Sequence, residues 1–391
     1  MRVLQLLSHK VTHMPRAALI YNDALSRHVL RDNHPMVPTR LRYTHELIDA
    51  YGVLAAPSAR LVDPRRATED ELRLFHTAEY IGAVGALSRG EQLEQAEKFN
   101  FSARGDNPIY PGMHDAALLS TGASLTAVDL LMEGACDVAC NFSGGLHHAM
   151  PAYASGFCIF NDPVIAIKAI TRRGLKVAYV DIDCHHGDGV QYAFYDSAQV
   201  LTISIHESGR YLFPGTGFPE EIGTGRGRGF SVNVPLFPYT QDALYLWAFR
   251  EVVPPLIRAF KPDVLVTQLG IDTHFNDPLT HIQLSVQGFA QVVEELAALS
   301  PGKWLALGGG GYDISAVTRG WTLAFSRMTG ASLPEQIPQT FQEKYGLKLL
   351  LDVPLADLDL QRRAQARRYA EDSVAAARRL LFPFHGLSAN A

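Results

Sequence analysis

The sequence predicts one large α/β domain of three layers, in which helices cover both faces of a mainly parallel sheet. Apolar runs with the composition of strands alternate along the chain with stretches of helical period, and this alternation is typical of parallel sheets. A hydrophobic content of 47% in 391 residues is enough to bury a core of that size. We therefore expect a single domain over residues 1–391, with residues 335–391 as a helical extension packed on it.

The individual elements follow from local composition and period. The strand-like runs cover residues 137–142, 176–181, 199–205, 263–270 and 303–307. The helical stretches cover residues 114–132, 162–172, 241–260, 285–299, 314–328 and 361–381. Residues 99–112 and 215–229 are expected to form long surface loops. In open α/β sheets ligands gather at the carboxyl ends of the strands, and each motif described next follows such an end.

Composition and charge exclude several classes of protein. The net charge is -5 and the sequence holds no sustained block of Lys and Arg, so nothing indicates a nucleic-acid groove. Four cysteines without a paired zinc-ribbon spacing favour a reducing compartment. The apolar residues 1–7 are followed too soon by Ser8 for a secretory signal, and no apolar run reaches the length of a membrane span. We expect a cytoplasmic protein without nucleic-acid or membrane partners.

The segment that follows the run 176–181 has the composition of a metal site. Side chains two apart on a strand share a face, so Asp181, Asp183 and His185 are expected to point one way and Cys184 the other. An oxygen and nitrogen pair such as Asp183 and His185 suits Zn²⁺ or Fe²⁺. Taken alone, the segment is better explained as an Asp- and His-rich turn that caps the next helix.

A third carboxylate, Asp272, follows the strand-like run 263–270. Asp183, His185 and Asp272 would give three protein ligands and leave a position open for water, which is the pattern of a catalytic zinc. Water bound at such a site has a pKa of roughly 7 and becomes a usable nucleophile. In isolation Asp272 is as well explained as a helix N-cap.

Adjacent imidazoles, His147 and His148, follow the run 137–142 on a loop. Adjacent side chains project differently, so both rings could reach one water. Asp181 and Asp188 are available to hold the other ring nitrogens, which fixes the tautomer and raises basicity. The alternative for each histidine alone is a loop residue satisfied by local hydrogen bonds.

Four glycines and a phenol, residues 308–312, follow the last strand-like run. Glycine allows close approach of the backbone, and Tyr312 could then donate a hydrogen bond to a substrate carbonyl. A phosphate loop is the alternative, but the lysine and hydroxyl residue of that motif are missing. The glycines at 223–229 precede a strand, so they are not a dinucleotide-binding fingerprint.

Together these motifs closely resemble the histone deacetylase family of the arginase-deacetylase fold, particularly bacterial acetoin-utilisation deacetylases and class I enzymes. The resemblance covers roughly residues 40–321. The segments that carry it are residues 144–149, 155–162, 181–189, 213–217, 268–272 and 308–312.

The resemblance implies which ions the chain holds. Asp183, His185 and Asp272 would bind Zn²⁺, with Fe²⁺ as the alternative metal. A first site for K⁺ or Na⁺ would use residues of the strand ends, namely Asp181, Asp183, His185, Ser204 and the backbone of Ile205. A second site would use carbonyls near Phe194, Ser197, Val200 and Phe230, where Ser and Phe replace the family's frequent Thr and Tyr.

The resemblance also implies catalytic roles. His148 would be the general base and then the general acid, held by Asp188. His147, paired with Asp181, would be its electrostatic partner. Tyr312 would polarise the amide carbonyl and stabilise the oxyanion.

The substrate would enter through the family's narrow acyl-lysine tunnel. Its walls would be Gly156, Phe157, Phe213 and Leu279, and Asp106 would stand at its rim. We therefore expect a zinc-dependent amidohydrolase that removes acetyl, or a similar small acyl group, from lysine side chains of proteins or peptides.

Three other functions on the same fold are alternatives to this prediction. An N-acetylpolyamine deacetylase is the nearest, and the neutral Leu279 disfavours it because polyamine-specific relatives can carry an acidic gatekeeper. An arginase-type enzyme with two manganese ions needs a further acid where this chain has His274. A non-catalytic acyl-lysine-binding protein would not need the intact set of ligands, histidines and tyrosine. The oligomeric state is left open.

Overall fold

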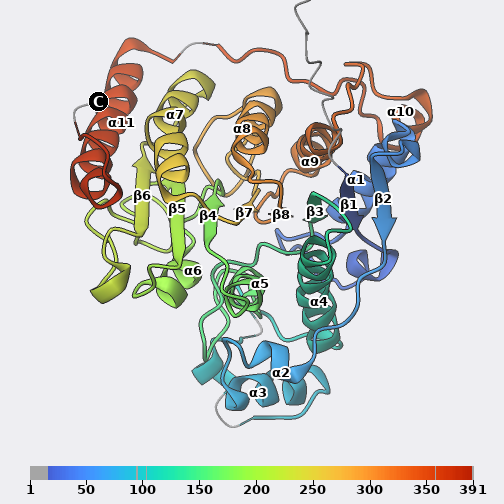
Figure 1. The fold of residues 1–391 in the computed structure, drawn as a ribbon. Coiled ribbons are helices and arrows are strands. Elements are labelled where there is room, and N and C mark those ends of the chain that lie inside the picture. The colour runs from blue at the N-terminus through green and yellow to red at the C-terminus, as the bar shows by residue number, and fades with distance from the viewer. Residues whose placement is uncertain (1–15, 94–95, 103, 357, 390–391) are drawn as a thin grey trace, which may run out of the picture.

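An eight-stranded sheet forms the middle layer of the molecule, and every strand pairing in the described residues is parallel (Figure 1). The structure is a computed structural model that describes residues 16–93, 96–102, 104–356 and 358–389. The strand order is β2-β1-β3-β8-β7-β4-β5-β6. The strands are β1 (Ala17–Ile20), β2 (Ala59–Val62), β3 (Val138–Asn141), β4 (Val177–Asp181), β5 (Val200–Glu207), β6 (Ser231–Leu236), β7 (Val264–Gln268) and β8 (Trp304–Leu307).

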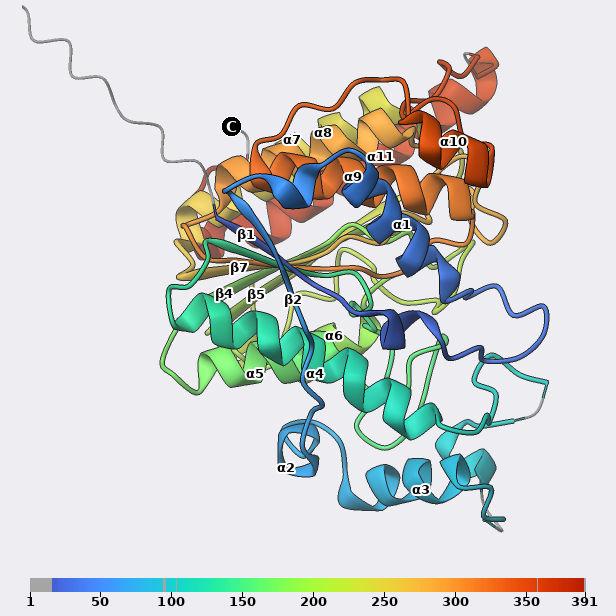
Figure 2. The same cartoon turned by 90° about the vertical axis from the view of Figure 1, so that its right-hand side faces the viewer.

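Helices cover both faces of this sheet, which gives the three layers expected from the sequence. Figure 2 shows the sheet nearly edge-on, with α1, α7, α8, α9 and α11 on one side and α4, α5 and α6 on the other. The short helices α2 and α3 lie beyond α4 (Figure 2). The helices are α1 (Thr39–Ala50), α2 (Glu69–Leu72), α3 (Ala78–Ser88), α4 (Met113–Met132), α5 (Asp162–Thr171), α6 (Asp188–Phe194), α7 (Asp242–Phe260), α8 (Val286–Leu299), α9 (Ile314–Thr329), α10 (Gln339–Tyr345) and α11 (Leu360–Leu381).

The core is split into two apolar clusters by the sheet. In β4, Ala178 and Val180 belong to the cluster under α7, α8 and α9, whereas Val177 and Tyr179 belong to the cluster over α4 and α5. Both sets are buried because helices cover both faces. Strands that are buried on both faces have continuous apolar runs in the sequence, and such runs predicted β3, β4, β5, β7 and β8.

The predicted helices differ from the structure mainly at their ends. Ser285 was expected inside α8, but it precedes the helix, and its side chain accepts a hydrogen bond from the N–H of Gly288 as an N-cap. The strands β1 and β2 were not predicted, and β6 was expected only as a strand that follows the glycines at 223–229, without bounds. In β2, Arg60 and Leu61 are exposed, so this strand lacks the continuous apolar run of a strand that is buried on both faces.

One helix corrects an expectation about apolar runs. Helix α4, Met113–Met132, has 20 residues and a mean hydropathy of 1.2, so by length and composition alone it resembles a membrane span. In the fold, 56% of this stretch is buried inside the protein, and α4 packs against β3 and α5. The expectation about residues 1–7 concerns residues outside the described part of the chain.

The C-terminal segment packs against the same sheet. Helix α11 contacts β6 and α7, and the hydroxyl of Ser373 donates to the carbonyl of Pro235 at 2.7 Å. Between α10 and α11 the chain crosses the outer side of the helical layer (Figure 1). Residues 349–356 therefore run past the helices α8 and α9 that support the site.

Candidate active site

Four neighbouring strands, β3, β8, β7 and β4, end at one edge of the sheet. Each is followed by polar side chains that the sequence singled out. The strand order therefore brings together four motifs that are far apart in the chain. They are His147 and His148 after β3, Tyr312 after β8, Asp272 after β7, and Asp183 and His185 after β4.

The side chains of Asp183, His185 and Asp272 converge in the buried interior. Their ligand atoms all lie within 4.8 Å of one another. Nδ1 of His185 lies 3.1 Å from Oδ1 of Asp183 and 2.9 Å from Oδ2 of Asp272. Two ligands of a tetrahedral zinc with bonds of about 2.1 Å lie roughly 3.4 Å apart. This set of two oxygens and one nitrogen therefore fits a divalent metal ion.

The electrostatics of the cluster point to a cation as well. Burial and the charge of Asp183 raise the pKa of Asp272 to about 7. Two buried carboxylates repel each other, and a bound cation relieves that repulsion. A Cβ at Gly310 would lie 2.1 Å from Oδ2 of Asp272, so glycine at this position gives the carboxylate its room.

The remaining carboxylate oxygens are held by the protein. Oδ2 of Asp183 accepts hydrogen bonds from Nε2 of Gln268 and from the N–H of Gly310, both at 2.7 Å. Oδ1 of Asp272 accepts from the N–H of Cys184 at 2.8 Å. Such contacts orient metal ligands. This role of Gln268 was not predicted, although an amide at the end of an apolar strand was an available signal.

The predicted division of side chains between two faces applies to the segment after β4. Asp183 and His185 lie in the metal cluster, and Asp181 points to His147. Cys184 packs in the apolar cluster on the opposite face, under α7, where its Sγ lies 3.7 Å from Oε2 of Glu207.

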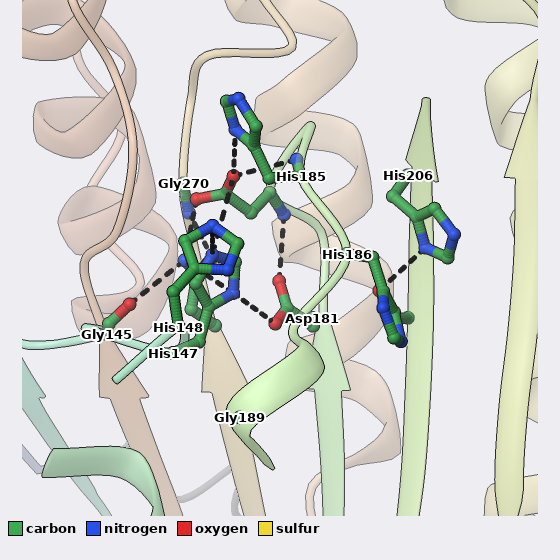
Figure 3. A network of polar contacts seen from close by, with 12 residues as sticks. Gly145, His147, His148, Asp181, His185, His186, Gly189, His206 and Gly270 are labelled. Carbon is green, nitrogen blue, oxygen red and sulfur yellow. Dashed lines mark hydrogen bonds and ion pairs between the residues drawn. The ribbon is translucent and has the colours of Figure 1, made fainter. Parts of the chain in front are cut away.

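The two histidine rings face each other beside the metal cluster (Figure 3). Their Nε2 atoms lie 3.0 Å apart. Nδ1 of His147 donates to Oδ2 of Asp181 at 2.7 Å, and Nδ1 of His148 donates to Oδ1 of Asp188 at 2.7 Å. These are the pairs expected from the sequence. The hydroxyl of Tyr179 also donates to Asp181, at 2.7 Å.

The two rings have different protonation. Burial lowers the pKa of His147, but the charges of Asp181 and Asp183 outweigh burial and raise it to about 9. For His148, burial and the neighbouring charge of His147 lower the pKa to about 4, against the opposing effect of Asp188. In the metal-free site, His147 is therefore the more basic ring, and it holds the proton that its Nε2 donates to Nε2 of the neutral His148.

The loop that carries the histidines is fixed by residues for which no role was predicted. Nδ2 of Asn161 donates to the carbonyl of His147 at 3.1 Å. Asp162 accepts from the N–H of Leu146 at 2.9 Å, and burial raises the pKa of its carboxyl to about 6. Nε2 of His76 accepts from the N–H of Asn161 at 2.9 Å. The signal in the sequence was an Asn-Asp pair at the start of α5.

Tyr312 lies beside the metal cluster, in the segment that precedes α9. Its backbone N–H donates to Oδ2 of Asp277 at 2.8 Å. Burial and the carboxylates of Asp272 and Asp183 raise the pKa of its phenol well above the ordinary value. The phenol therefore stays protonated, and it is a hydrogen-bond donor across the physiological range.

Two of the predicted tunnel residues lie directly on His148. The ring centroid of Phe213 is 5.0 Å from that of His148, and 45% of Phe213 is exposed. A Cβ at Gly156 would lie 2.4 Å from the ring of His148, so only glycine fits. Leu279 is partly buried, and its N–H donates to Oδ1 of Asp277 at 3.0 Å.

Phe157 has an unusual backbone conformation, with φ at 70°. Its ring packs edge-on against Tyr312, at 5.7 Å between centroids. Its N–H donates to Oδ1 of Asn107 at 3.0 Å, and the ring of His34 packs against it at 4.6 Å. His34 also donates from Nε2 to the carbonyl of Asp106 at 3.3 Å. The predicted rim residue Asp106 and the wall residue Phe157 thus belong to one connected loop system.

The residues predicted to hold a first monovalent cation are neighbours in the sheet. Ser204 of β5 pairs with Asp181 of β4. The hydroxyl of Ser204 lies 2.8 Å from Nδ1 of His206, and the carbonyl of Ile205 accepts from the hydroxyl of Tyr245 at 3.5 Å. His206 lies apart from the group around His148 (Figure 3).

Carbonyls of the second predicted cation site also have partners within the protein. The carbonyl of Phe194 accepts from the N–H of Ser197 at 3.0 Å, and that of Phe230 accepts from the N–H of Thr202 at 2.9 Å. Both cation sites remain predictions.

Comparison with known proteins gives a consistent result. Residues 34–328 match the model of the histone deacetylase domain. The acetoin utilization protein AcuC of Bacillus subtilis is 40% identical over 339 residues, which cover 85% of this chain and 87% of that protein. AcuC of Staphylococcus aureus strain MSSA476 is 39% identical over 320 residues, which cover 80% of this chain and 82% of that protein.

Solved structures agree with the sequence comparison. The crystal structure of an HDAC homologue from Aquifex aeolicus superposes with a TM-score of 0.81 at 31% identity, over 93% of this chain and 99% of that chain. A structure of an HDAC homologue complexed with SAHA gives the same values.

Proposed function

This chain belongs to the histone deacetylase family, as an AcuC-like deacetylase, and we propose that it removes acetyl groups from lysine side chains of proteins or peptides with a bound zinc ion. The observation that carries the proposal is the convergence of three buried ligands, a histidine pair of unequal basicity and a protonated tyrosine at one edge of the sheet. Three ligands with an open position are typical of catalytic zinc.

A bound metal ion would supply Lewis-acid chemistry, which no side chain of the site provides. An ion held by Asp183, His185 and Asp272 would lower the pKa of a bound water to roughly 7 and polarise the substrate carbonyl. Zn²⁺ suits this set of ligands, and Fe²⁺ is the alternative. We also propose that K⁺ or Na⁺ binds near Asp181, Ser204 and the carbonyl of Ile205.

His148 moves the proton. It is neutral near pH 7, and Asp188 accepts the hydrogen on Nδ1, so Nε2 carries no hydrogen and is the atom of the ring that would accept a proton from water. As the water oxygen bonds to the carbonyl carbon, that proton passes to Nε2. As the carbon–nitrogen bond breaks, His148 gives the proton to the departing amine. The products are acetate and the free lysine side chain.

His147 and Tyr312 stabilise the charge that develops. His147 donates from Nδ1 to the carboxylate of Asp181, so it would hold positive charge 3.0 Å from His148. The phenol of Tyr312 donates a hydrogen bond to the carbonyl oxygen as that oxygen becomes negative. Such donors are strongest in the transition state.

The wall residues suit an extended, uncharged stem. Phe157, Phe213, Gly156 and Leu279 would line the slot for the lysine methylenes, and Asp106 would face the peptide backbone at the rim. The neutral Leu279 favours acyl-lysine over N-acetylpolyamines.

The direct test compares two substrate classes on zinc-reconstituted protein. Release of acetate from an acetyl-lysine peptide and from N-acetylputrescine is measured side by side, with metal-free protein as the control. Metal-dependent turnover that favours the peptide supports the proposal. Preferential turnover of N-acetylputrescine would overturn the substrate assignment while keeping the chemistry, and binding of the peptide without turnover at any metal loading would indicate a binding protein.

A further inference from the structure

Asp352, in the C-terminal segment, contacts the turn that follows Asp272, through the side chain of His274. Only 6% of its side chain is exposed, although it belongs to a segment between helices. Its Oδ1 accepts from Nη1 of Arg319 at 2.6 Å, and its Oδ2 accepts from the N–H of Val286 at 2.8 Å. Burial raises the pKa of the Asp352 carboxyl, but hydrogen bonds from His274, from the N–H of Val286 and from Arg319 outweigh burial and lower it to about 2. Asp352 is therefore a fixed, buried negative charge.

Asp352 also fixes the orientation of His274, whose side chain is 1% exposed. Nε2 of His274 lies 2.9 Å from Oδ2 of Asp352, and Nδ1 accepts from the N–H of Asn276 at 3.1 Å. Because Nδ1 accepts, the ring hydrogen is on Nε2 and is donated to Asp352. The carboxylate thus selects the tautomer that closes the turn after Asp272.

The turn closed by His274 ends at Asp277. The N–H of Asp277 donates to the carbonyl of His274 at 2.9 Å. The carboxylate of Asp277 then accepts from the N–H of Tyr312 at 2.8 Å and from the N–H of Leu279 at 3.0 Å. A continuous chain of hydrogen bonds therefore runs from Asp352 to the backbone of the tyrosine beside the metal cluster.

We propose that Asp352 and His274 are positioning residues that set the place of Tyr312 through Asp277. Asp352 lies outside the residues 34–328 that match the family model, so this support comes from the C-terminal segment of this chain. The proposal rests on the function proposed above for Tyr312. It gives the C-terminal segment a part in catalysis without any contact with substrate.

A double-mutant cycle tests the proposal on the full-length, zinc-reconstituted protein. His274→Phe keeps a ring of similar size but cuts the chain of hydrogen bonds, and Asp352 keeps its partner Arg319. We expect kcat on an acetyl-lysine peptide to fall about tenfold, with KM changed less than threefold. In a Tyr312→Phe background the same change should lower kcat less than twofold, because the group that it positions is gone.

The controls separate positioning from general loss of structure. Asp352→Asn should reproduce the effect of His274→Phe, whereas Asp372→Asn, an exposed acid of the same segment, should leave kcat unchanged. If His274→Phe lowers kcat equally in both backgrounds, the hydrogen bonds from Asp352 and His274 do not act by positioning Tyr312, and the proposal is overturned.

Hydrogen exchange gives a readout that needs no activity. In the His274→Phe protein, amides of residues 274–284 and of Tyr312 should exchange at least tenfold faster, while those of β4 stay unchanged. Unchanged exchange at Tyr312 would overturn the proposal. If the wild type turns over no acetylated substrate, the proposed function fails, and the exchange experiment still decides whether Asp352 and His274 hold the tyrosine.

Discussion

Nε2 of His147 and Nε2 of His148 lie 3.0 Å apart, and the two rings differ in pKa, which is raised to about 9 in His147 and lowered to about 4 in His148. Two neighbouring imidazoles cannot both carry a charge at low cost. The carboxylates around His147 favour the charge on that ring, and His148 remains neutral. We propose that His147 thus supplies positive charge and that His148 accepts a proton.

This division predicts a large effect for His148. Replacing His148 with Ala should lower kcat on an acetylated substrate by about two to four orders of magnitude, because the proton carrier is lost. Zinc content should not change, since His148 is not part of the ligand cluster. Steady-state kinetics with elemental analysis checks both points, and a kcat within tenfold of the wild type would remove His148 from the proposed role.

Removal of a proposed metal ligand should produce a different defect, which is loss of the metal itself. Asp272→Ala deletes one oxygen of the buried cluster, so the protein should lose most of its zinc after dialysis against a weak chelator. His148→Ala protein treated in parallel is the matched control for a change inside the site. Full zinc occupancy in the Asp272→Ala protein would contradict the assignment of Asp272 as a ligand.

The conformation of Phe157, a proposed wall residue of the substrate tunnel, depends on the side chain of Asn107. Asn107 holds the N–H of Phe157, whose φ of 70° is unfavourable for a residue with a side chain. Loss of this hydrogen bond costs about 1 kcal/mol, so Asn107→Leu should lower kcat/KM on the peptide roughly five- to tenfold. Ser102→Ala, in the same loop, should leave it within twofold. Equal effects of the two changes would argue against a specific role of Asn107.

Because His76 is buried, we predict that the free energy of unfolding depends on pH. Burial lowers its pKa from 6.5 to about 4, so the unfolded chain takes up a proton in this range and the folded protein does not. The contribution of neutral His76 to the free energy of unfolding is therefore fully present above pH 6.5. It is lost as the pH falls from 6.5 to 4, which lowers the free energy of unfolding by up to about 3 kcal/mol.

The variant His76→Gln isolates that contribution, because glutamine can keep both hydrogen bonds without titrating. Urea unfolding at pH 7, 6 and 5 should show that the wild type loses more stability than the variant as the pH falls. Parallel stability curves for the two proteins would show that His76 does not titrate as described.

The sequence predicted those parts of the site that depend on local pattern. Asp183 and His185 lie two residues apart after an apolar strand, and a parallel sheet brings the ends of such strands to one edge. The common edge then placed Asp272 and Tyr312 near them without further information. The three-layer parallel fold followed from the same alternation of elements.

What the sequence did not indicate depends on packing between distant segments. Gln268 and His76 hold the ligand cluster and the histidine loop, but neither belongs to a spacing pattern. Asp352 is 78 residues from its partner His274. Such residues are recognisable only when the buried polar groups of the site are traced to their partners.

The central claim is that Tyr312 stabilises the oxyanion in a metal-dependent deacetylation. Single-turnover rates of Tyr312→Phe and wild-type protein, each loaded with one equivalent of zinc, test it most directly. We predict a rate lower by about two orders of magnitude or more in the variant, with peptide binding and zinc content unchanged. A rate like that of the wild type at equal zinc content would contradict the account.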